Sequence, residues 1–225
     1  MSERWRILIA GVGGQGVLSA GRWLGEAAEA GGVSMAVSEL HGMSQRGGSV
    51  RSEVAIGGMR SPEIADGMAN VLVALEPMEA ARALSKVSRR TTVFVNTRPL
   101  LPSSLQSTGR PYPLLSSLLG PIREVVGSLA TVDATSLAER AGGPRSLNVV
   151  MLGMLAGSEL LSLPSDGILS AIVSGALPAL VEINRNAFRL GTEAVKVNGV
   201  ATRGLQTYNG RFPAPTLIVK PGDRL

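Results

Sequence analysis

The sequence predicts an α/β protein with a Rossmann-like, mainly parallel sheet, an antiparallel insertion and a helical C-terminal third. Three features predict this class. Residues 6–30 combine a short apolar run, a glycine turn and a helical pattern, residues 49–56 alternate between two faces, and the patterns beyond residue 141 are helical. The 225 residues suffice for one such domain. We expect residues 1–199 to form a single domain and residues 200–225 to form an extended C-terminal tail.

The first predicted strand and helix lie on either side of a glycine turn. Residues 6–10 (RILIA) are a short apolar run, and residues 17–30 show helical periodicity. The glycine pair at 31–32 ends this helix, and residues 33–38 follow as a second strand. We therefore expect a parallel strand, helix, strand crossover, which is right-handed by the general rule.

Residues 49–56 predict an antiparallel strand. They place Val50, Ser52, Val54 and Ile56 on one face, and we expect the other face to be wet or covered by a partner. The glycine pair at 57–58 favours a tight hairpin turn after this strand. The fold is then not a purely alternating βα structure.

The rest of the chain completes the sheet and then becomes helical. We predict strands at residues 70–75, 91–96 and 129–134, a helix that Pro77 opens and that runs to about residue 87, and an irregular connection at 101–120. Beyond residue 141 we predict helices at 147–161, 165–175 and 178–197. In the tail, the apolar run at 216–219 favours docking on a neighbour.

The composition excludes several classes of protein. With 44% hydrophobic and 17% charged residues, the chain has enough apolar surface to fold. It has no cysteine and one histidine, His41, which excludes disulfides, thiolate zinc sites, ordinary iron–sulfur ligation and polyhistidine sites. We assign it no metal ligand. The polar N-terminus has no signal-peptide pattern and no apolar run reaches the roughly 20 residues of a membrane span, so we expect a cytoplasmic protein.

The first motif is Gly11-Val12-Gly13-Gly14-Gln15-Gly16, which has the spacing G-x-G-x-x-G between strand and helix. Gly11 permits a tight turn, Gly13 allows close approach, and Gly16 lets the helix pack against the strand. Free N–H groups at the helix start favour an anion such as phosphate. In a dinucleotide-binding protein, Glu39 would hold the ribose. Alternatively, the glycines serve only packing. The candidate binding residues here are Gly11, Gly13, Gly14, Gln15 and Gly16.

The second motif, HGMSQRGGS at residues 41–49, follows the second strand. Arg46 can bind a carboxylate or phosphate with two hydrogen bonds, and His41 can donate or accept near neutral pH. The alternative is an ordinary polar loop. We also select Arg98, in the loop after the strand at 91–96, because ligands of α/β proteins usually bind at the carboxyl edge of the sheet. The candidates from this motif are His41, Gln45, Arg46, Gly47, Gly48 and Ser49.

Spacing alone assembles no catalytic set, and we assign no catalytic residue. The chain has neither a G-x-S-x-G elbow nor a Walker phosphate loop. Glu76, Glu79 and Asp133 are carboxylates at strand ends, for which surface or helix-start roles are the alternative. The net charge of +5 comes from scattered arginines with 3% aromatic residues, so it does not favour nucleic acid.

The motifs together resemble a known family. The segments ILIAGVGGQGVLSAGRWL, SELHGMSQRGGSVRSEVAIG, ANVLVALEPMEAARAL and VFVNTRPLLP are similar to the beta subunit of indolepyruvate:ferredoxin oxidoreductase. More broadly, they resemble the gamma subunit or domain of 2-oxoacid:ferredoxin oxidoreductases. Further support comes from SLNVVMLGMLAG and NAFRLGTE. The resemblance covers residues 6–199, so the expected single domain is of this gamma type.

The resemblance implies a subunit of a complex that oxidatively decarboxylates aryl 2-oxoacids, transfers the acyl group to coenzyme A and passes electrons to ferredoxin. Thiamine diphosphate, Mg and the iron–sulfur clusters then belong to a larger catalytic subunit, through which ferredoxin is reduced. By this analogy, the two loops lie near the partner and the coenzyme A path, with Arg46 and Arg98 as candidates for anionic groups. The alternative is a free-standing NAD(P)-dependent oxidoreductase; a third hypothesis is a nucleic-acid-binding or scaffold protein.

Overall fold

The computed structural model describes residues 4–41, 48–59, 61–100, 111–197 and 216–218. The strands are β1 (Trp5–Val12), β2 (Met35–His41), β3 (Ser49–Ile56), β4 (Val71–Ala74), β5 (Thr92–Asn96), β6 (Ser128–Val132) and β7 (Thr216–Ile218). The helices are α1 (Val17–Ala30), α2 (Pro77–Arg82), α4 (Leu115–Val125), α5 (Ala134–Arg140), α6 (Leu147–Gly157), α7 (Ser165–Ser174) and α8 (Pro178–Val197). Two 3₁₀ turns lie at Leu84–Lys86 and Pro144–Ser146.

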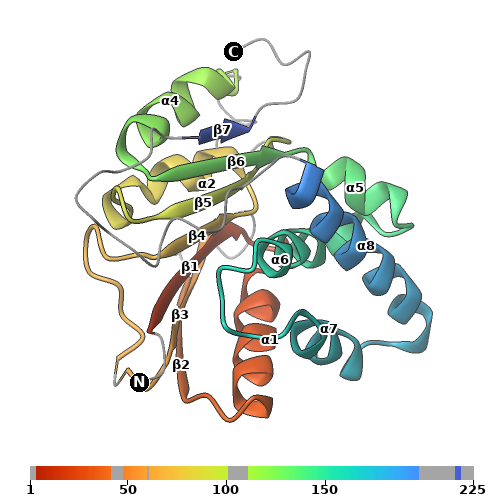
Figure 1. Ribbon diagram of the computed structural model, residues 1–225. Coiled ribbons are helices and arrows are strands. Elements are labelled where there is room, and N and C mark those ends of the chain that lie inside the picture. Colours follow the sequence, from red (N-terminus) through yellow and green to blue (C-terminus); the bar gives the residue numbers. More distant parts are fainter. Residues whose placement is uncertain (1–3, 42–47, 60, 101–110, 198–215, 219–225) are drawn as a thin grey trace.

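In the described part of the chain, the strands form a seven-stranded sheet in the order β2-β3-β1-β4-β5-β6-β7 (Figure 1). β1, β4, β5, β6 and β7 are parallel to one another, whereas β3 is antiparallel to both β1 and β2. The predicted fold class, a mainly parallel sheet with an antiparallel insertion, is confirmed. Of the predicted tail, residues 216–218 form β7, and residues 200–215 and 219–225 lie outside the described residues.

The first crossover differs from the prediction. β1 and β2 run in the same direction, but β3 lies between them, because β2 and β3 form a hairpin. The predicted hairpin turn after residue 56 is wrong, since no strand forms in residues 57–59 and 61–70. Instead, the N–H of Gly57 donates to the carbonyl of Ser34 at 2.9 Å, which extends the pairing of β2 with β3.

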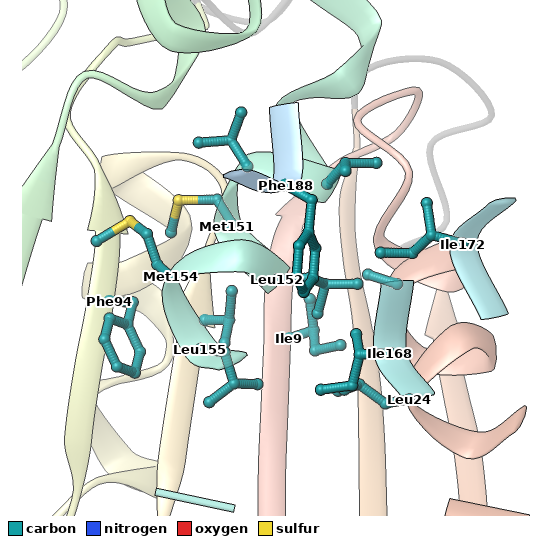
Figure 2. Packing of buried hydrophobic residues seen from close by; sticks show 14 of the residues in the cluster. Ile9, Leu24, Phe94, Met151, Leu152, Met154, Leu155, Ile168, Ile172 and Phe188 are labelled. Atoms are coloured by element: carbon teal, nitrogen blue, oxygen red, sulfur yellow. The ribbon is translucent and has the colours of Figure 1, made fainter. Parts of the chain in front are cut away.

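The sheet is buried on both faces by two apolar cores. One core joins alternate residues of the central strands, such as Ile9 and Phe94, to α1, α5, α6, α7 and α8 (Figure 2). The other joins the intervening residues, such as Leu8 and Leu72, to α2 and α4. Burial on both faces explains why these strands read as continuous apolar runs. It also corrects the expected wet face of β3, because Glu53 and Ala55 are buried.

The helical C-terminal third is held by α6 and α8. A Cβ on Gly153 would overlap the backbone of Phe188, and one on Gly191 would overlap the carbonyl of Val150. The backbones of the two helices are therefore in direct contact here, and only glycine, which has no Cβ, permits this approach at these positions. They contain the segments SLNVVMLGMLAG and NAFRLGTE, so the two later parts of the family resemblance are one packing interface.

Three helices depart from the predicted elements. The helix that Pro77 opens, α2, ends at Arg82 rather than near residue 87, and the 3₁₀ turn at Leu84–Lys86 follows it. Residues 115–125 form α4 although they contain Pro121 and were expected to continue an irregular connection to residue 120. Leu119 and Ile122 of α4 are buried in the second core, and this burial outweighs the missing proline N–H. The strand predicted at 129–134 ends at Val132, because the side chain of Asp133 caps the helix α5.

Candidate functional site

The two glycine-flanked motifs lie side by side at the carboxyl end of β1. Val12, the last residue of β1, pairs with Ser49, the first residue of β3, and the N–H of Gly13 donates to the carbonyl of Gly48 at 2.9 Å. His41 ends β2 and pairs with Val50. Gln45, Arg46 and Gly47 lie outside the described residues. The described ends of the second motif, His41, Gly48 and Ser49, therefore lie at the carboxyl ends of the parallel strands, where α/β proteins bind ligands.

The glycine turn is shaped by the side chain of Gln15. Its Oε1 accepts a hydrogen bond from the N–H of Val12 at 2.8 Å, and its Nε2 donates to the carbonyl of Leu75 at 3.1 Å. A Cβ on Gly11 would lie 2.8 Å from Val17 and 2.9 Å from Gln15, so a side chain there would displace the turn. Gln15 thus links the ends of β1 and β4, and both of its described hydrogen bonds are to backbone groups of this chain.

Gly16 has a different role from the one expected. Its φ of 79° lies in the left-handed region, and a Cβ would overlap the side-chain amide of Asn148 on α6. The Nδ2 of Asn148 donates to the carbonyl of Gly16 at 3.1 Å. Gly16 therefore packs the start of α1 against α6 rather than against the strand. Gly13 and Gly14 are the exposed members of the turn.

Ser49 is held by a buried carboxylate. Its hydroxyl donates to Glu79 Oε2 at 2.5 Å, and the other oxygen of Glu79 pairs with Arg82. Arg51, two residues along β3, donates from Nη2 to the carbonyl of Arg82 at 2.9 Å. These contacts fix the start of β3 on α2. Glu79 is buried in the first turn of α2, so of the two roles considered for it the helix-start role is confirmed and the surface role is wrong.

Glu76 joins α2 to the chain after β5. It is buried, and its Oε2 caps α2 by accepting from the N–H of Glu79 at 3.0 Å. Its Oε1 accepts from Tyr112 and from the N–H of Leu100 at 3.3 Å. Partial burial and the bond to Glu76 raise the pKa of Tyr112 far above its ordinary value, so the phenol keeps its proton and donates. The predicted helix-start role of Glu76 is confirmed.

Asn96 and Arg98 organise the ends of β5 and β6. The side chain of buried Asn96 donates to the carbonyl of Leu75 at 3.0 Å and accepts from the N–H of Ala134 at 3.0 Å. The Nη2 of Arg98 donates to Asp133 at 3.0 Å and to Ser136 Oγ at 2.7 Å. Arg98 already has an anionic partner in this structure.

The carboxylate of Asp133 is stabilised in its charged form. Partial burial alone would raise its pKa, but hydrogen bonds from the N–H and hydroxyl of Ser136 and from Arg98 outweigh burial, so the pKa lies below its ordinary value. The bond to Asp133 in turn raises the pKa of Arg98. Asp133 also caps α5 by accepting from the N–H of Ser136 at 2.9 Å, which confirms its helix-start role.

The site therefore brings together the glycine turn, the start of β3, α2 and the ends of β4, β5 and β6. Glu39 does not have the ribose-binding position of a dinucleotide site, because β3 lies between its strand and β1. Sequence reasoning missed Tyr112, Asn96 and Asn148. Their local sequence gives no such signal, since each acts on a partner more than 20 residues away. Among the described residues, no three His, Asp or Glu side chains group as metal ligands, and no helix is long and apolar enough to span a membrane.

Comparison with known proteins decides between the hypotheses. A family model described as pyruvate ferredoxin/flavodoxin oxidoreductase matches residues 6–194. The chain belongs to this family. Indolepyruvate oxidoreductase subunit IorB of Methanothermobacter thermautotrophicus is 38% identical over 187 residues, which cover 83% of this chain and 95% of that protein.

Solved structures share the fold of this family member. The gamma subunit of a keto/oxoacid ferredoxin oxidoreductase from Geobacter sulfurreducens PCA has a TM-score of 0.62 and 23% identity, covering 87% of this chain and 98% of that one. A 2-oxoglutarate:ferredoxin oxidoreductase from Magnetococcus marinus has a TM-score of 0.66 and 19% identity, covering 88% of this chain and 32% of that one. The predicted resemblance is confirmed: the chain is a subunit of a 2-oxoacid:ferredoxin oxidoreductase, and the NAD(P) alternative is not supported.

Proposed function

We propose that this chain is the non-cofactor subunit of a cytoplasmic complex that oxidatively decarboxylates aryl 2-oxoacids of the indolepyruvate type. In this reaction the acyl group passes to coenzyme A and the electrons pass to ferredoxin. One observation supports the proposal: the chain is 38% identical to an indolepyruvate oxidoreductase subunit, and the described ends of its second glycine-flanked motif adjoin the first at the carboxyl end of β1.

The electron-carrying groups belong to the partner in this proposal. The chain has no cysteine, so it has no thiolate for an iron–sulfur cluster, and it has no G-D-G motif of the thiamine type. Its residues do not fit these groups. Thiamine diphosphate, Mg and the clusters are therefore assigned to a larger catalytic subunit, which also reduces ferredoxin.

The two loops contact that subunit and the path of coenzyme A. Gly13 and Gly14 are exposed, and Ser49 is held by Glu79, so one side of the site is open while its base is fixed. The related Magnetococcus marinus protein is a structure with coenzyme A bound, which supports coenzyme A as the cosubstrate. We keep His41, Gln45, Arg46, Gly47, Gly48 and Arg98 as contacts in this proposal.

The decisive experiment is co-purification from native extract. Tagged chain should recover a brown complex that oxidises indolepyruvate and phenylpyruvate with coenzyme A and ferredoxin, and pyruvate more slowly. The large subunit prepared without this chain should be inactive. Full activity of the isolated large subunit, or recovery of this chain alone, would overturn the proposed function.

Arg46→Ala tests the second motif within the complex. Loss of the guanidinium should raise the KM for coenzyme A or weaken assembly, because Arg46 is assigned to an anionic group. Arg90→Ala is the matched control, because Arg90 is exposed and precedes β5, at the amino ends of the parallel strands. If Arg46→Ala leaves both KM and assembly unchanged, Arg46 does not belong to the site.

A further inference from the structure

The outer edge of β2 has no partner strand in the described part of the chain. β2 is the first strand in the sheet order and pairs only with β3 (Figure 1). An open strand of this length presents backbone N–H and C=O groups that can pair with another chain. Native proteins usually protect such an edge with lysine, proline, a bulge or a covering segment.

β2 has no lysine, no proline and no bulge in its pairing with β3. Its residues are MAVSELH, with Glu39 as the one charged side chain. Leu40 is 50% exposed, and the preceding residues from Met35 to Ser38 are partly exposed. An open edge with one charged residue and a half-exposed leucine is expected to be covered in the assembled protein.

The ladder with β3 shows which backbone groups face outward. The N–H of Gly57 donates to the carbonyl of Ser34, so Ser34 and Gly57 are a hydrogen-bonded pair. In an antiparallel ladder, hydrogen-bonded and non-hydrogen-bonded residues alternate. Ala36, Ser38 and Leu40 therefore bond to β3, whereas the N–H and C=O groups of the odd-numbered residues 35–41 face the open edge.

We propose that β2 pairs antiparallel with β2 of a second copy of this chain, about a twofold axis at Ser38. This register pairs all seven residues and matches the outward groups of one copy with those of the other. It sets Leu40 against Ala36 of the second copy, apolar against apolar, and Glu39 against Val37. The two sheets then form one continuous sheet across the interface.

The neighbouring registers are less favourable. A twofold axis at Glu39 would set two glutamates directly opposite each other, and like charges in this position are destabilising. An axis at Val37 would leave Leu40 and His41 without a partner residue within the strand. The position of one charge and one exposed leucine thus selects the axis at Ser38. This proposal is independent of the proposed substrate and of coenzyme A.

Ser38→Cys tests the axis directly. The chain contains no cysteine, so this variant has a single thiol. The two Ser38 residues form a non-hydrogen-bonded pair in the proposed register, with Cα atoms about 4.5 Å apart, within the range that a disulfide spans. Mild oxidation should convert most of the variant into a disulfide-linked dimer. Ser116→Cys, at an exposed position of α4, is the matched control and should form no disulfide-linked dimer under the same oxidation.

Val37→Pro tests the edge pairing through the molar mass of the chain in solution. Proline removes an outward N–H but no bond of β2 to β3. Light scattering should find the wild-type chain dimeric, Val37→Pro monomeric and the control Leu177→Lys, at a 69% exposed position, still dimeric. The proposal would be overturned if the wild-type chain were monomeric or if Val37→Pro remained dimeric. It would also be overturned if Ser38→Cys formed its crosslink with the large subunit instead of with a second copy. If Val37→Pro fails to fold, the crosslink decides.

Discussion

Gly16 starts α1 with a φ of 79° and leaves the space that the amide of Asn148 fills. In Gly16→Ala the left-handed conformation costs about 1–2 kcal/mol for an L-residue. The added methyl also displaces Asn148 and its hydrogen bond, which adds about 1–2 kcal/mol. We expect a total loss of about 2–4 kcal/mol in the free energy of unfolding, measured by urea denaturation of the whole chain.

Gly14→Ala is the control for this prediction. Gly14 has a φ of 96° but no atom within 4 Å of a Cβ position, so its substitution tests backbone strain without a clash. It should cost about 1–3 kcal/mol. Adding Asn148→Ala should recover part of the loss in Gly16→Ala but none of the loss in Gly14→Ala. Equal behaviour of the two glycines in this comparison would contradict the assigned role of Gly16.

Asp133 combines a helix cap with an ion pair. Asp133→Ala removes both and should cost about 1–2 kcal/mol, the usual effect of losing an N-cap. Asp133→Asn keeps a capping oxygen and loses the pair with Arg98, so it should cost less than about 1 kcal/mol, as exposed ion pairs do. Chemical denaturation of the two variants separates these contributions.

The pH dependence of Asp133 follows from its lowered pKa. The folded state favours the ionised form of Asp133 more than the unfolded chain does. The stabilisation is therefore present above the unfolded pKa of about 3.9, and it is lost as pH falls through the lower folded pKa. The difference in stability between wild type and Asp133→Ala should therefore be constant near pH 7 and shrink below about pH 4. A difference that grows on acidification would contradict this assignment.

At the scale of elements, α6 and α8 cross at backbone distance. Gly191→Ala places a methyl on the carbonyl of Val150, so the helices must separate. Overpacking of this kind costs about 1–3 kcal/mol, and the better helix propensity of alanine offsets less than that. Gly167→Ala in α7 is the matched control: no atom lies within 4 Å of its Cβ position, and it should stabilise by about 0.4–1 kcal/mol. The midpoint temperature of thermal unfolding should fall for Gly191→Ala and rise for Gly167→Ala.

The same elements show what the sequence could predict. Apolar runs and helical periodicity located β4, β5, α1 and α8, because burial imposes those patterns locally. The place of β3 between β1 and β2 could not be predicted, since it depends on pairing between distant strands. The start of α4 was missed because the prolines and serines of residues 101–120 suggest an irregular connection, whereas the apolar core on that face of the sheet favours a helix. In the site, the sequence predicted the two glycine motifs. It did not predict Asn148 and Tyr112, because their hydrogen-bond partners are far away in the sequence.

At the scale of the whole molecule, the two apolar cores share the central strands. Leu72 of β4 is fully buried in the core beneath α2 and α4, while Val71 and Val73 belong to the opposite core. Both tryptophans, Trp5 and Trp23, pack against that opposite core, so their fluorescence reports on one face only. A defect on the other face reaches them only if the domain unfolds as one unit.

Leu72→Ala tests this coupling. Truncation of a fully buried leucine should cost about 2–5 kcal/mol. Because β4 is common to both cores, the urea midpoint seen by tryptophan fluorescence should fall by the same amount as the midpoint seen by far-ultraviolet circular dichroism. Val73→Ala, on the tryptophan side of the same strand, is the control and should move both probes together. If Leu72→Ala shifted the dichroism transition and left the fluorescence transition in place, the two faces would be separate folding units, and residues 1–199 would not form the single domain that we expect.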